Sequence, residues 1–377
     1  QSDNLQEEYI ELWNGGTSAL DLSGWKFVDG IDFVFPSVTV PANEYLVVAA
    51  DEAVFTAKYP NVTNVVGGWT GRLSNRGEDI ELENAAGILV DQVRYSDQGE
   101  WAVRVEGALD QGHRGWTWQA AHDGDGKSLE LINPALPNEH GQNWSSSLVN
   151  EGTPGAVNSV AASDVAPLVV DVSHLPAIPR SSDPVTVVAR IVDESAAGLS
   201  AVLHYRPDGE QEFQTLTMFD DGQHGDGNAV DGVYGAAIPP QPDGTIVEVY
   251  LEAADSGGML RNWPAVVESS AGLRANLLYQ VLDASDAHQT WNPDSQPIDY
   301  LIMTDAERAE LADIGDGPVS EAQSNAQMNG TLIHVDGSGI DVRYNVGIRN
   351  RGGNSRVGPP NNYRVNIPHD RPIGGVS

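Results

Sequence analysis

The feature that most constrains the fold is the alternation of apolar and polar residues in short runs. In "PVTVVARIVD" one face of an extended strand would carry Val185, Val187, Ala189 and Ile191, and "GTIVEVYLEAAD" repeats the pattern from residue 244. Many of the 40 glycines and 22 prolines separate such runs. A period of two indicates half-buried strands, and short strands between Gly/Pro turns are typical of β-sandwiches. The sequence therefore predicts a mainly β fold.

Composition excludes several functional classes. The 377 residues are enough for two or three domains. A net charge of −34 repels nucleic acid and attracts cations, so we expect no nucleic-acid partner. The absence of cysteine excludes disulfides and thiolate metal sites, and it fits an exported protein stabilised by Ca²⁺. With no apolar run long enough to cross a bilayer, we also expect no membrane span in this chain.

The first section, residues 1–159, carries local signals for a sandwich with one helix. "DEAVFTAKYP" predicts a helix with Asp51 as N-cap and Pro60 beyond its end. "DIELENAAGILVDQVRY" predicts a hairpin that turns at Asn84–Gly87. Turn signals at this spacing favour an immunoglobulin-like sandwich.

Four separated motifs of this section appear in an order that resembles a bacterial lamin-tail domain. They are "EEYIELWNGGTSALDLSGWKFVDG", "YLVVAAD", "GKSLELINPALPNEHGQNWSSS" and "NEGTPGAVNS". The resemblance covers about Glu7 to Ser159. It implies an immunoglobulin-like sandwich used as an appended module on secreted or surface proteins, and it implies no catalysis.

A second sandwich is predicted over residues 167–267, after a linker of small residues at Val160–Pro167. Its hairpin turns at Pro207-Asp208-Gly209. The section resembles the fibronectin-type or immunoglobulin-like repeats of bacterial surface proteins. A poorly patterned stretch, Glu268–Gln296, is expected to be a second linker.

The third section, residues 297–377, is predicted to begin with the strand "IDYLIMT". Thr304 and Glu307 form a T-x-x-E capping box for a helix through about Asp313, and a hairpin is expected to turn at Asp336–Gly339. This run resembles the beginning of a CotH-type kinase domain, which implies the strand-rich start of an α+β, kinase-like fold. The residues that bind metal in that family come later than Ser377.

The loop "MFDDGQHGDGNAVDGVYGAAIP" contains far more acidic residues and glycines than a turn requires. Hard cations need six to eight oxygen ligands on a backbone that can bend, and glycines allow that bending. We therefore predict a Ca²⁺ site, with His224 as a surface residue beside it. The alternative is a solvated hairpin tip in which Asp and Gly satisfy turn geometry. The candidate ligands are Asp220, Asp221, Asp226, Asn228 and Asp231.

Arginines gather in the third section although the chain is acidic. Arg351 and Arg356 are candidates for phosphate or nucleotide contact, and the alternative is that the arginines pair with carboxylates on neighbouring strands. ATP and Mg²⁺ are expected only if a catalytic half follows. We name no catalytic residue, and we expect residues 1–377 to be inactive as an enzyme. The cluster comprises Arg343, Arg349, Arg351, Arg356, Arg364 and Arg371.

Together these features predict a non-catalytic fragment of a large secreted or cell-surface bacterial protein. Its calcium-binding sandwiches would serve adhesion or spacing, with protein or glycan partners at the surface. One alternative is the N-terminal region of a CotH-like ATP-dependent kinase. Another is a carbohydrate-binding module in which four tryptophans form an aromatic platform for a sugar. The alternative for these residues is that they fill the core: Trp101, Trp116, Trp118 and Trp144.

Overall fold

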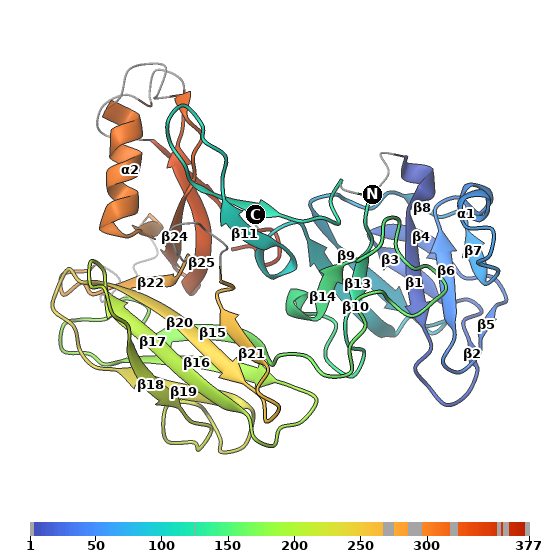
Figure 1. The fold of residues 1–377 in the computed structure, drawn as a ribbon, viewed down its shortest axis with the longest axis horizontal. Coiled ribbons are helices and arrows are strands. Elements are labelled where there is room, and N and C mark those ends of the chain that lie inside the picture. Colours follow the sequence, from blue (N-terminus) through green and yellow to red (C-terminus); the bar gives the residue numbers. More distant parts are fainter. Residues whose placement is uncertain are drawn as a thin grey trace. The chain divides into compact units, whose positions relative to one another are not determined.

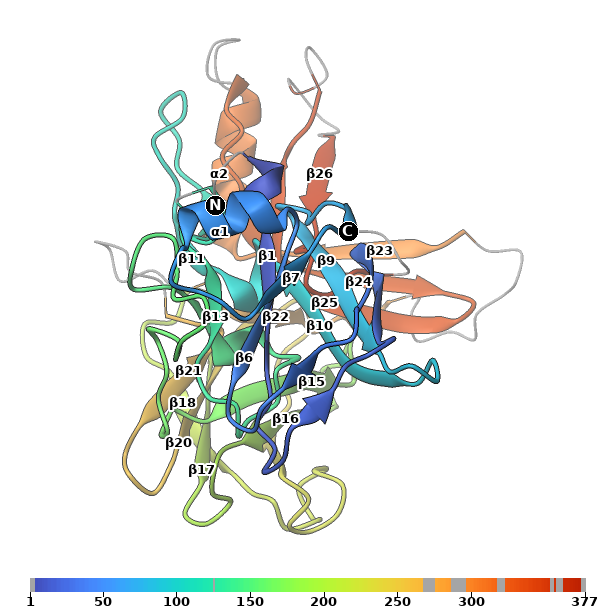
Figure 2. The same cartoon turned by 90° about the vertical axis from the view of Figure 1, so that its right-hand side faces the viewer.

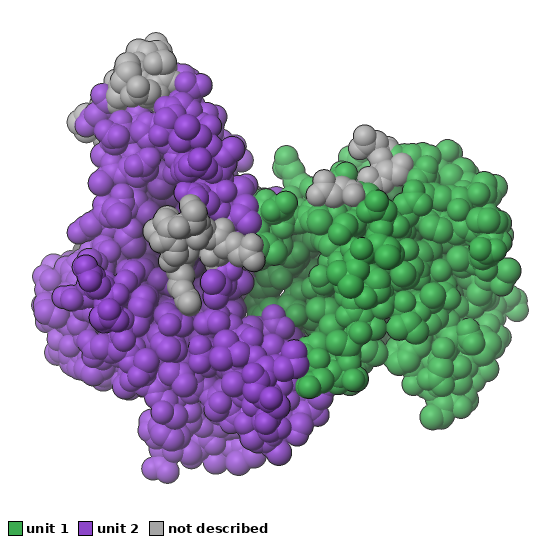
Figure 3. Space-filling view, viewed as in Figure 1, with its two compact units in different colours: residues 1–103, 118–165 green, residues 104–117, 166–377 purple. Residues whose placement is uncertain are grey.

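The computed structural model describes residues 4–124, 126–266, 275–285, 296–316, 323–352, 356 and 362–373. The chain forms two compact units, coloured separately in Figure 3. Unit 1 comprises residues 1–103 and 118–165, and unit 2 comprises residues 104–117 and 166–377. The predicted mainly β fold is confirmed. No helix in the described part of the chain is long and apolar enough to cross a membrane.

Unit 1 is built around a sheet with the order β1-β6-β7 and a sheet with the order β10-β9-β3-β4-β8. Short pairs β2–β5 and β13–β14 accompany them (Figure 1). The strands are β1 (Tyr9–Trp13), β2 (Leu20–Asp21), β3 (Lys26–Asp29), β4 (Ile31–Val34), β5 (Thr39–Val40), β6 (Tyr45–Ala49), β7 (Val65–Gly67), β8 (Thr70–Gly71), β9 (Gly77–Glu83), β10 (Leu89–Ser96), β13 (Leu129–Leu131) and β14 (Trp144–Ser146). The helices are α1 (Glu52–Lys58) and three 3₁₀ turns, η1 (Leu5–Glu7), η2 (Gly99–Trp101) and η3 (Gly141–Asn143).

The core of unit 1 lies between these two sheets. The apolar face of β1 packs Ile10 and Leu12 against a cluster that includes the buried Phe27 and Leu82. On α1, the predicted N-cap is confirmed, because the Asp51 carboxylate accepts hydrogen bonds from the backbone N–H groups of Ala53 and Val54. The predicted hairpin is also confirmed, since β9 and β10 pair around residues 84–88.

Residues 104–117 belong to unit 2, although the lamin-tail resemblance spans them. They include most of β11 (Val103–Glu106), the loop that follows it and the first two residues of β12 (Trp116–Gln119), and the two strands pair with each other. The buried Arg104 donates to the Asn329 side chain and to the Asn345 carbonyl, each at 2.9 Å. Trp116 donates its indole N–H to Glu307 at 2.8 Å. Burial raises the pKa of Glu307 to about 7, although the Trp116 bond acts to lower it.

The sandwich of unit 2 contains the sheets β15-β16-β19 and β18-β17-β20-β21, with β22 also paired to β20. Its core contains the fully buried Val187, Leu203 and Leu251. The predicted hairpin at residues 207–209 is confirmed by the pairing of β17 with β18. The strands are β15 (Leu168–Leu175), β16 (Val185–Val192), β17 (Ser200–Pro207), β18 (Gln214–Met218), β19 (Val233–Ile238), β20 (Ile246–Ala254), β21 (Leu260–Trp263) and β22 (Leu277–Gln280).

The presence of β22 corrects the expectation that residues 268–296 form a linker. In the described part of that stretch, Leu277 and Tyr279 are fully buried in the sandwich core. Leu278 is buried in a second cluster. The physical reason is that alternate side chains of a strand point to opposite faces, and on β22 each face packs against a different hydrophobic cluster. The rest of the stretch lies mostly outside the described residues.

The third section forms a sheet with the order β23-β24-β25-β26, and α2, which contacts β24 and β25, lies beside β24 in Figure 1. Figure 2 shows the same elements from the side. The predicted hairpin at Asp336–Gly339 is confirmed. Only one of the two hydrogen bonds of the predicted capping box forms. Thr304 accepts from the Glu307 backbone N–H at 3.2 Å, but the Glu307 side chain turns to Trp116. The elements are β23 (Ile298–Ile302), α2 (Asp305–Asp316), β24 (Met328–Asp336), β25 (Gly339–Asn350) and β26 (Tyr363–Asn366).

We predict that the hydrogen bond and packing of Trp116 stabilise the attachment of residues 104–117 to the rest of unit 2. Trp116→Phe leaves the buried Glu307 without its indole donor and should lower the free energy of unfolding by about 1–3 kcal/mol. Trp116→Ala should cost about 3–5 kcal/mol because packing is lost too. Urea unfolding measures both, with Leu148→Ala, which truncates a 72 % exposed side chain, as the control. A Trp116→Phe protein as stable as the parent would show that the hydrogen bond contributes nothing.

Candidate functional site

The acidic loop connects β18 to β19 in unit 2. An isolated bridge between Phe219 and Gly235 closes it at its base. Four of its glycines and Val230 have positive φ angles, so the backbone folds back on itself repeatedly. This tight path brings backbone N–H groups to the aspartate side chains.

Asp226 organises the first half of the loop. One carboxylate oxygen accepts from the backbone N–H groups of Asp221 and Gly222, both at 2.7 Å, and the other accepts from His224 N–H at 2.8 Å. The residue is only 1 % exposed. Burial opposes its ionisation, but the N–H groups outweigh that effect and lower the pKa of Asp226.

Asp220 and Asp231 organise the second half. The two Asp220 oxygens accept from the backbone N–H groups of Asp231 and Gly232 at 3.1 and 3.0 Å. Asp231 in turn accepts from the N–H groups of Asn228 and Val233, both at 3.0 Å. Backbone N–H groups therefore supply positive potential around these carboxylates.

Of the five predicted ligands, Asp221 and Asp226 come together with a third residue, His224. One potential ligand atom of each lies within 4.8 Å of the others. Nδ1 of His224 is 2.8 Å from an Asp221 oxygen, and this contact lowers the pKa of Asp221. The His224 ring also stacks on Phe219, with 4.6 Å between ring centroids. From the sequence, His224 is expected to be a surface residue beside the site. The spacing D-x-x-H-x-D was the signal that could have included it.

Three arginines of the third section, Arg343, Arg349 and Arg356, bond to groups within the fold. Buried Arg356 donates to the carbonyls of Gln323 and Ser324 at 2.9 and 2.8 Å, and to the Asn325 side chain at 2.9 Å. Arg343 forms an ion pair with Asp370. Arg351 is exposed. Arg343 thus pairs with a carboxylate, as the alternative expects, whereas the printed partners of Arg356 are carbonyl and amide oxygens.

Two of the four tryptophans proposed as a glycan platform are buried. Trp101 and Trp116 are 7 % and 8 % exposed, and Trp118 is half-buried. Trp144 lies against Trp101, with 5.7 Å between ring centroids, and it lines a cavity in unit 1.

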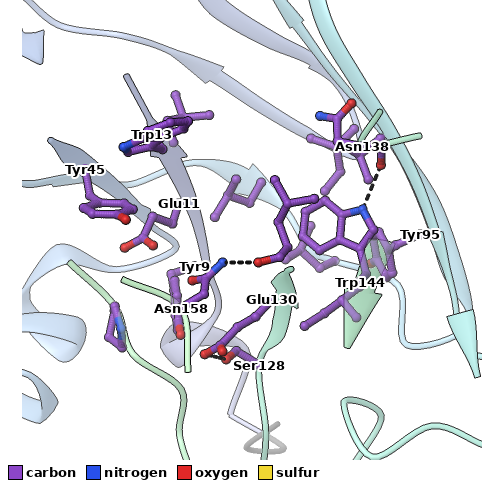
Figure 4. Close-up of a pocket in the computed structure, with 18 of the residues that line it drawn as sticks. Tyr9, Glu11, Trp13, Tyr45, Tyr95, Ser128, Glu130, Asn138, Trp144 and Asn158 are labelled. Atoms are coloured by element: carbon purple, nitrogen blue, oxygen red, sulfur yellow. Dashed lines mark hydrogen bonds between the residues drawn. The ribbon is translucent and has the colours of Figure 1, made fainter. Parts of the chain in front are cut away.

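This cavity has a volume of about 1000 Å³. Figure 4 shows Tyr9, Glu11 and Trp13 of β1 along one side, with Tyr45 of β6 beside them and Trp144 on the opposite side. Alternation along β1 explains the arrangement, because these odd-numbered side chains face away from the core that Ile10 and Leu12 contact.

The pKa values of two carboxylates in the cavity, Glu11 and Glu130, are shifted in opposite directions. Burial raises the pKa of Glu11 to about 7, against the effect of a hydrogen bond from the Gly155 N–H, and the neighbouring Glu130 raises it further. Burial also acts on Glu130, but hydrogen bonds led by that of Ser159 lower its pKa overall. Glu130 accepts from the backbone N–H and hydroxyl of Ser159 at 2.8 and 2.7 Å, and from Thr153 at 3.0 Å. Glu130 therefore holds the segment that follows β14.

The fold and these sites define a modular, mainly β protein with immunoglobulin-like domains. In comparisons with known families, residues 1–97 match the Lamin Tail Domain, in agreement with the first two motifs of the resemblance, while its extension to Ser159 stays a prediction. Residues 180–259 match the family described as the Conditioned medium factor 2nd Ig-like domain. No curated protein matched the chain. The kinase-like interpretation of residues 297–377 stays a prediction.

We predict that Glu11 makes unit 1 less stable as pH rises. Its pKa is about 7 in the folded state and 4.5 when unperturbed. The folded state therefore binds the proton more tightly, and the stabilisation is complete below pH 4.5 and lost as pH rises through 7. Each pKa unit corresponds to about 1.4 kcal/mol.

The measurement is urea unfolding of the wild type and Glu11→Gln at pH 5 and pH 8. The wild type should lose more stability between these pH values than the variant does. Groups that do not interact with residue 11 titrate equally in both proteins, so the difference isolates Glu11 together with its coupling to the neighbouring Glu130. Equal pH dependence would contradict the assignment.

Proposed function

We propose that this chain is a non-catalytic, modular segment of an exported bacterial cell-surface protein, whose sandwiches act as binding and spacing modules. The observation that carries the proposal is the presence of two matches to β domains, a lamin-tail domain and an immunoglobulin-like domain, in series. The excess of acidic residues supports it, because a net charge of −34 keeps an exported protein soluble and apart from anionic surfaces.

Exposure at the surface is testable in the bacterium that produces the protein. An antibody raised against residues 1–377 should label intact cells or precipitate the protein from the medium. A cytoplasmic protein, released only by lysis, serves as the control. Labelling that requires permeabilised cells would contradict the proposal.

We also propose that the acidic loop binds Ca²⁺ through Asp221 and Asp226, with His224 at the rim. The closeness of these three residues supports the proposal. Hydrogen bonds to backbone N–H groups do not preclude it, because a carboxylate has about four lone-pair positions and each N–H uses one. A glycine-rich loop also adapts to the irregular coordination of Ca²⁺ more readily than to the octahedron of Mg²⁺.

Calorimetric melting of the 377-residue chain with CaCl₂ and with EGTA tests this site. Calcium should raise the melting temperature of unit 2, with a stabilisation of about 2.7 kcal/mol at one hundred times the Kd, and Mg²⁺ should do so less. Asp221→Asn should remove the calcium-dependent part while leaving melting in EGTA almost unchanged.

Asp226→Ala is the matched control for loop integrity. It deprives three N–H groups of their acceptor and should lower the melting temperature even in EGTA. Coincident wild-type curves in CaCl₂ and EGTA would establish the solvated hairpin instead.

The alternatives depend on different parts of the chain. The kinase alternative rests on the resemblance of residues 297–377, and sequence beyond Ser377 that contains acidic metal ligands would favour it. The carbohydrate alternative now rests on the unit 1 cavity, where Trp13, Tyr45 and Trp144 offer aromatic faces.

A further inference from the structure

Residues 104–117 form an arm on unit 2 (Figure 1). The chain leaves unit 1 after Val103 and returns to it at Trp118. The two strands of the arm, β11 and β12, pair with each other and with no other described strand. The arm is therefore held on unit 2 by the contacts of its own side chains and loop backbone, and not by a continuous sheet.

The interface between the arm and the rest of unit 2 is polar. The Trp116 backbone N–H donates to the Gln327 carbonyl at 2.6 Å, and the Asp110 carboxylate accepts from the Asn325 N–H at 2.6 Å. Segments with few buried apolar contacts open locally at a lower free-energy cost than a hydrophobic core. We therefore expect the arm to open independently of the sandwich core. Only three residues of the arm are buried: Arg104, His113 and Trp116.

Glu307 of α2 is the carboxyl that the arm covers. Its Oε1 accepts from the Trp116 indole, and its Oε2 is buried with no hydrogen-bond partner in the described part of the chain. An ionised carboxylate in such a place has lost water without gaining enough donors in exchange. Burial is accordingly the main cause that raises the pKa of Glu307 to about 7.

Two charged residues from other elements face Glu307. Arg104 of the arm acts to lower the pKa of Glu307, and its own pKa, lowered by burial to about 10, leaves it charged at neutral pH. Glu248 of β20 acts in the opposite direction. Glu248 is itself paired with Arg206, whose Nε lies 2.9 Å from a Glu248 oxygen. The balance of these contacts leaves the neutral form of Glu307 favoured while the arm is docked.

We propose that docking of the arm is a pH switch, in which the arm stays on unit 2 while Glu307 is protonated and is released when this carboxyl ionises. Release removes Trp116 and Arg104 from the surface of α2 and opens Glu307 to water. The chain then joins the two units only at residues 165–166, where unit 1 ends and unit 2 resumes.

The direction of the pH dependence follows from the two states of Glu307. Its pKa is about 7 with the arm docked, against an unperturbed value of 4.5 that we assign to the released state. The docked state therefore binds the proton more tightly, so its extra stability is complete below pH 4.5 and is lost as pH rises through 7. These two values make the docking constant fall about tenfold between pH 6 and pH 8.

A second contact of the arm changes with pH in the same direction. Nδ1 of the buried His113 lies 2.8 Å from Oε1 of Glu310 on α2. A charged His113 would form an ion pair with Glu310, which also favours docking in acid. The test must therefore separate this pair from Glu307.

Hydrogen exchange of the 377-residue chain, followed by mass spectrometry between pH 5 and pH 8, measures docking directly. Exchange is corrected for its intrinsic pH dependence, and peptides from β16 and β20 report on the sandwich core. Protection of the Trp116 amide should fall about tenfold between pH 6 and pH 8, while protection of the core peptides stays constant. Protection of the arm that does not change with pH, or a parallel loss in β16 and β20, would overturn the proposal.

Two matched variants assign the switch to one carboxyl. Glu307→Gln resembles the protonated acid and should keep the arm protected at pH 8, with most of the pH dependence removed. Glu310→Gln removes the His113 pair instead and should retain the tenfold change. The reverse result, in which Glu310→Gln abolishes the change and Glu307→Gln does not, would show that the assignment to Glu307 is wrong.

The proposal stays testable if Glu307→Gln fails to fold. The wild type and Glu310→Gln then decide it, because a tenfold change present in both supports Glu307 and a change lost in Glu310→Gln contradicts it. All samples contain EGTA, so the outcome is independent of the calcium proposal for the acidic loop.

Discussion

Packing between sheets is the interaction on which both units depend, because the chain contains no cysteine with which to cross-link its strands. In unit 2, Val187, Leu203 and Leu251 are at most 1 % exposed and come from three different strands. Burial of each such side chain contributes about 1.5–3 kcal/mol. The alternating pattern that supplies these residues fixes which face of each strand points inward. The positions of the strands then determine where the connecting loops, and the carboxylates on them, lie.

The strand β22 shows how packing joins two parts that the sequence separates. Leu277 and Tyr279 enter the sandwich core, while Leu278 enters a cluster with Ile302 and Ile333 of the third section. The Leu278 N–H also donates to the Thr331 hydroxyl at 3.3 Å. A strand buried on both faces connects the two cores directly. The third section is therefore packed as part of unit 2, which accords with its assignment to a single compact unit.

The sequence predicts elements whose signals are local. The Asp51 cap, the hairpin at residues 84–88 and the alternation of β16 each depend on residues a few positions apart, and each is present in the structure. β22 was missed because a strand buried on both faces shows no alternation. The placement of residues 104–117 was missed for another reason. The contacts of Trp116 with residues near 307 and 327 depend on tertiary structure, and no spacing in the sequence encodes them.

The candidate site shows the same division between local and tertiary signals. Counting aspartates draws attention to the loop, but the count could not show where each carboxylate points. Asp220, Asp226 and Asp231 each accept backbone N–H groups, so negative charge is stabilised by the loop that carries it. Glu130 is stabilised by hydroxyl and N–H groups in the same way, whereas burial leaves Glu11 with a raised pKa. In a chain this acidic, the number of carboxylates is a poor guide to cation sites. The informative quantity is how many lone pairs remain after the backbone has been satisfied, and that depends on the fold.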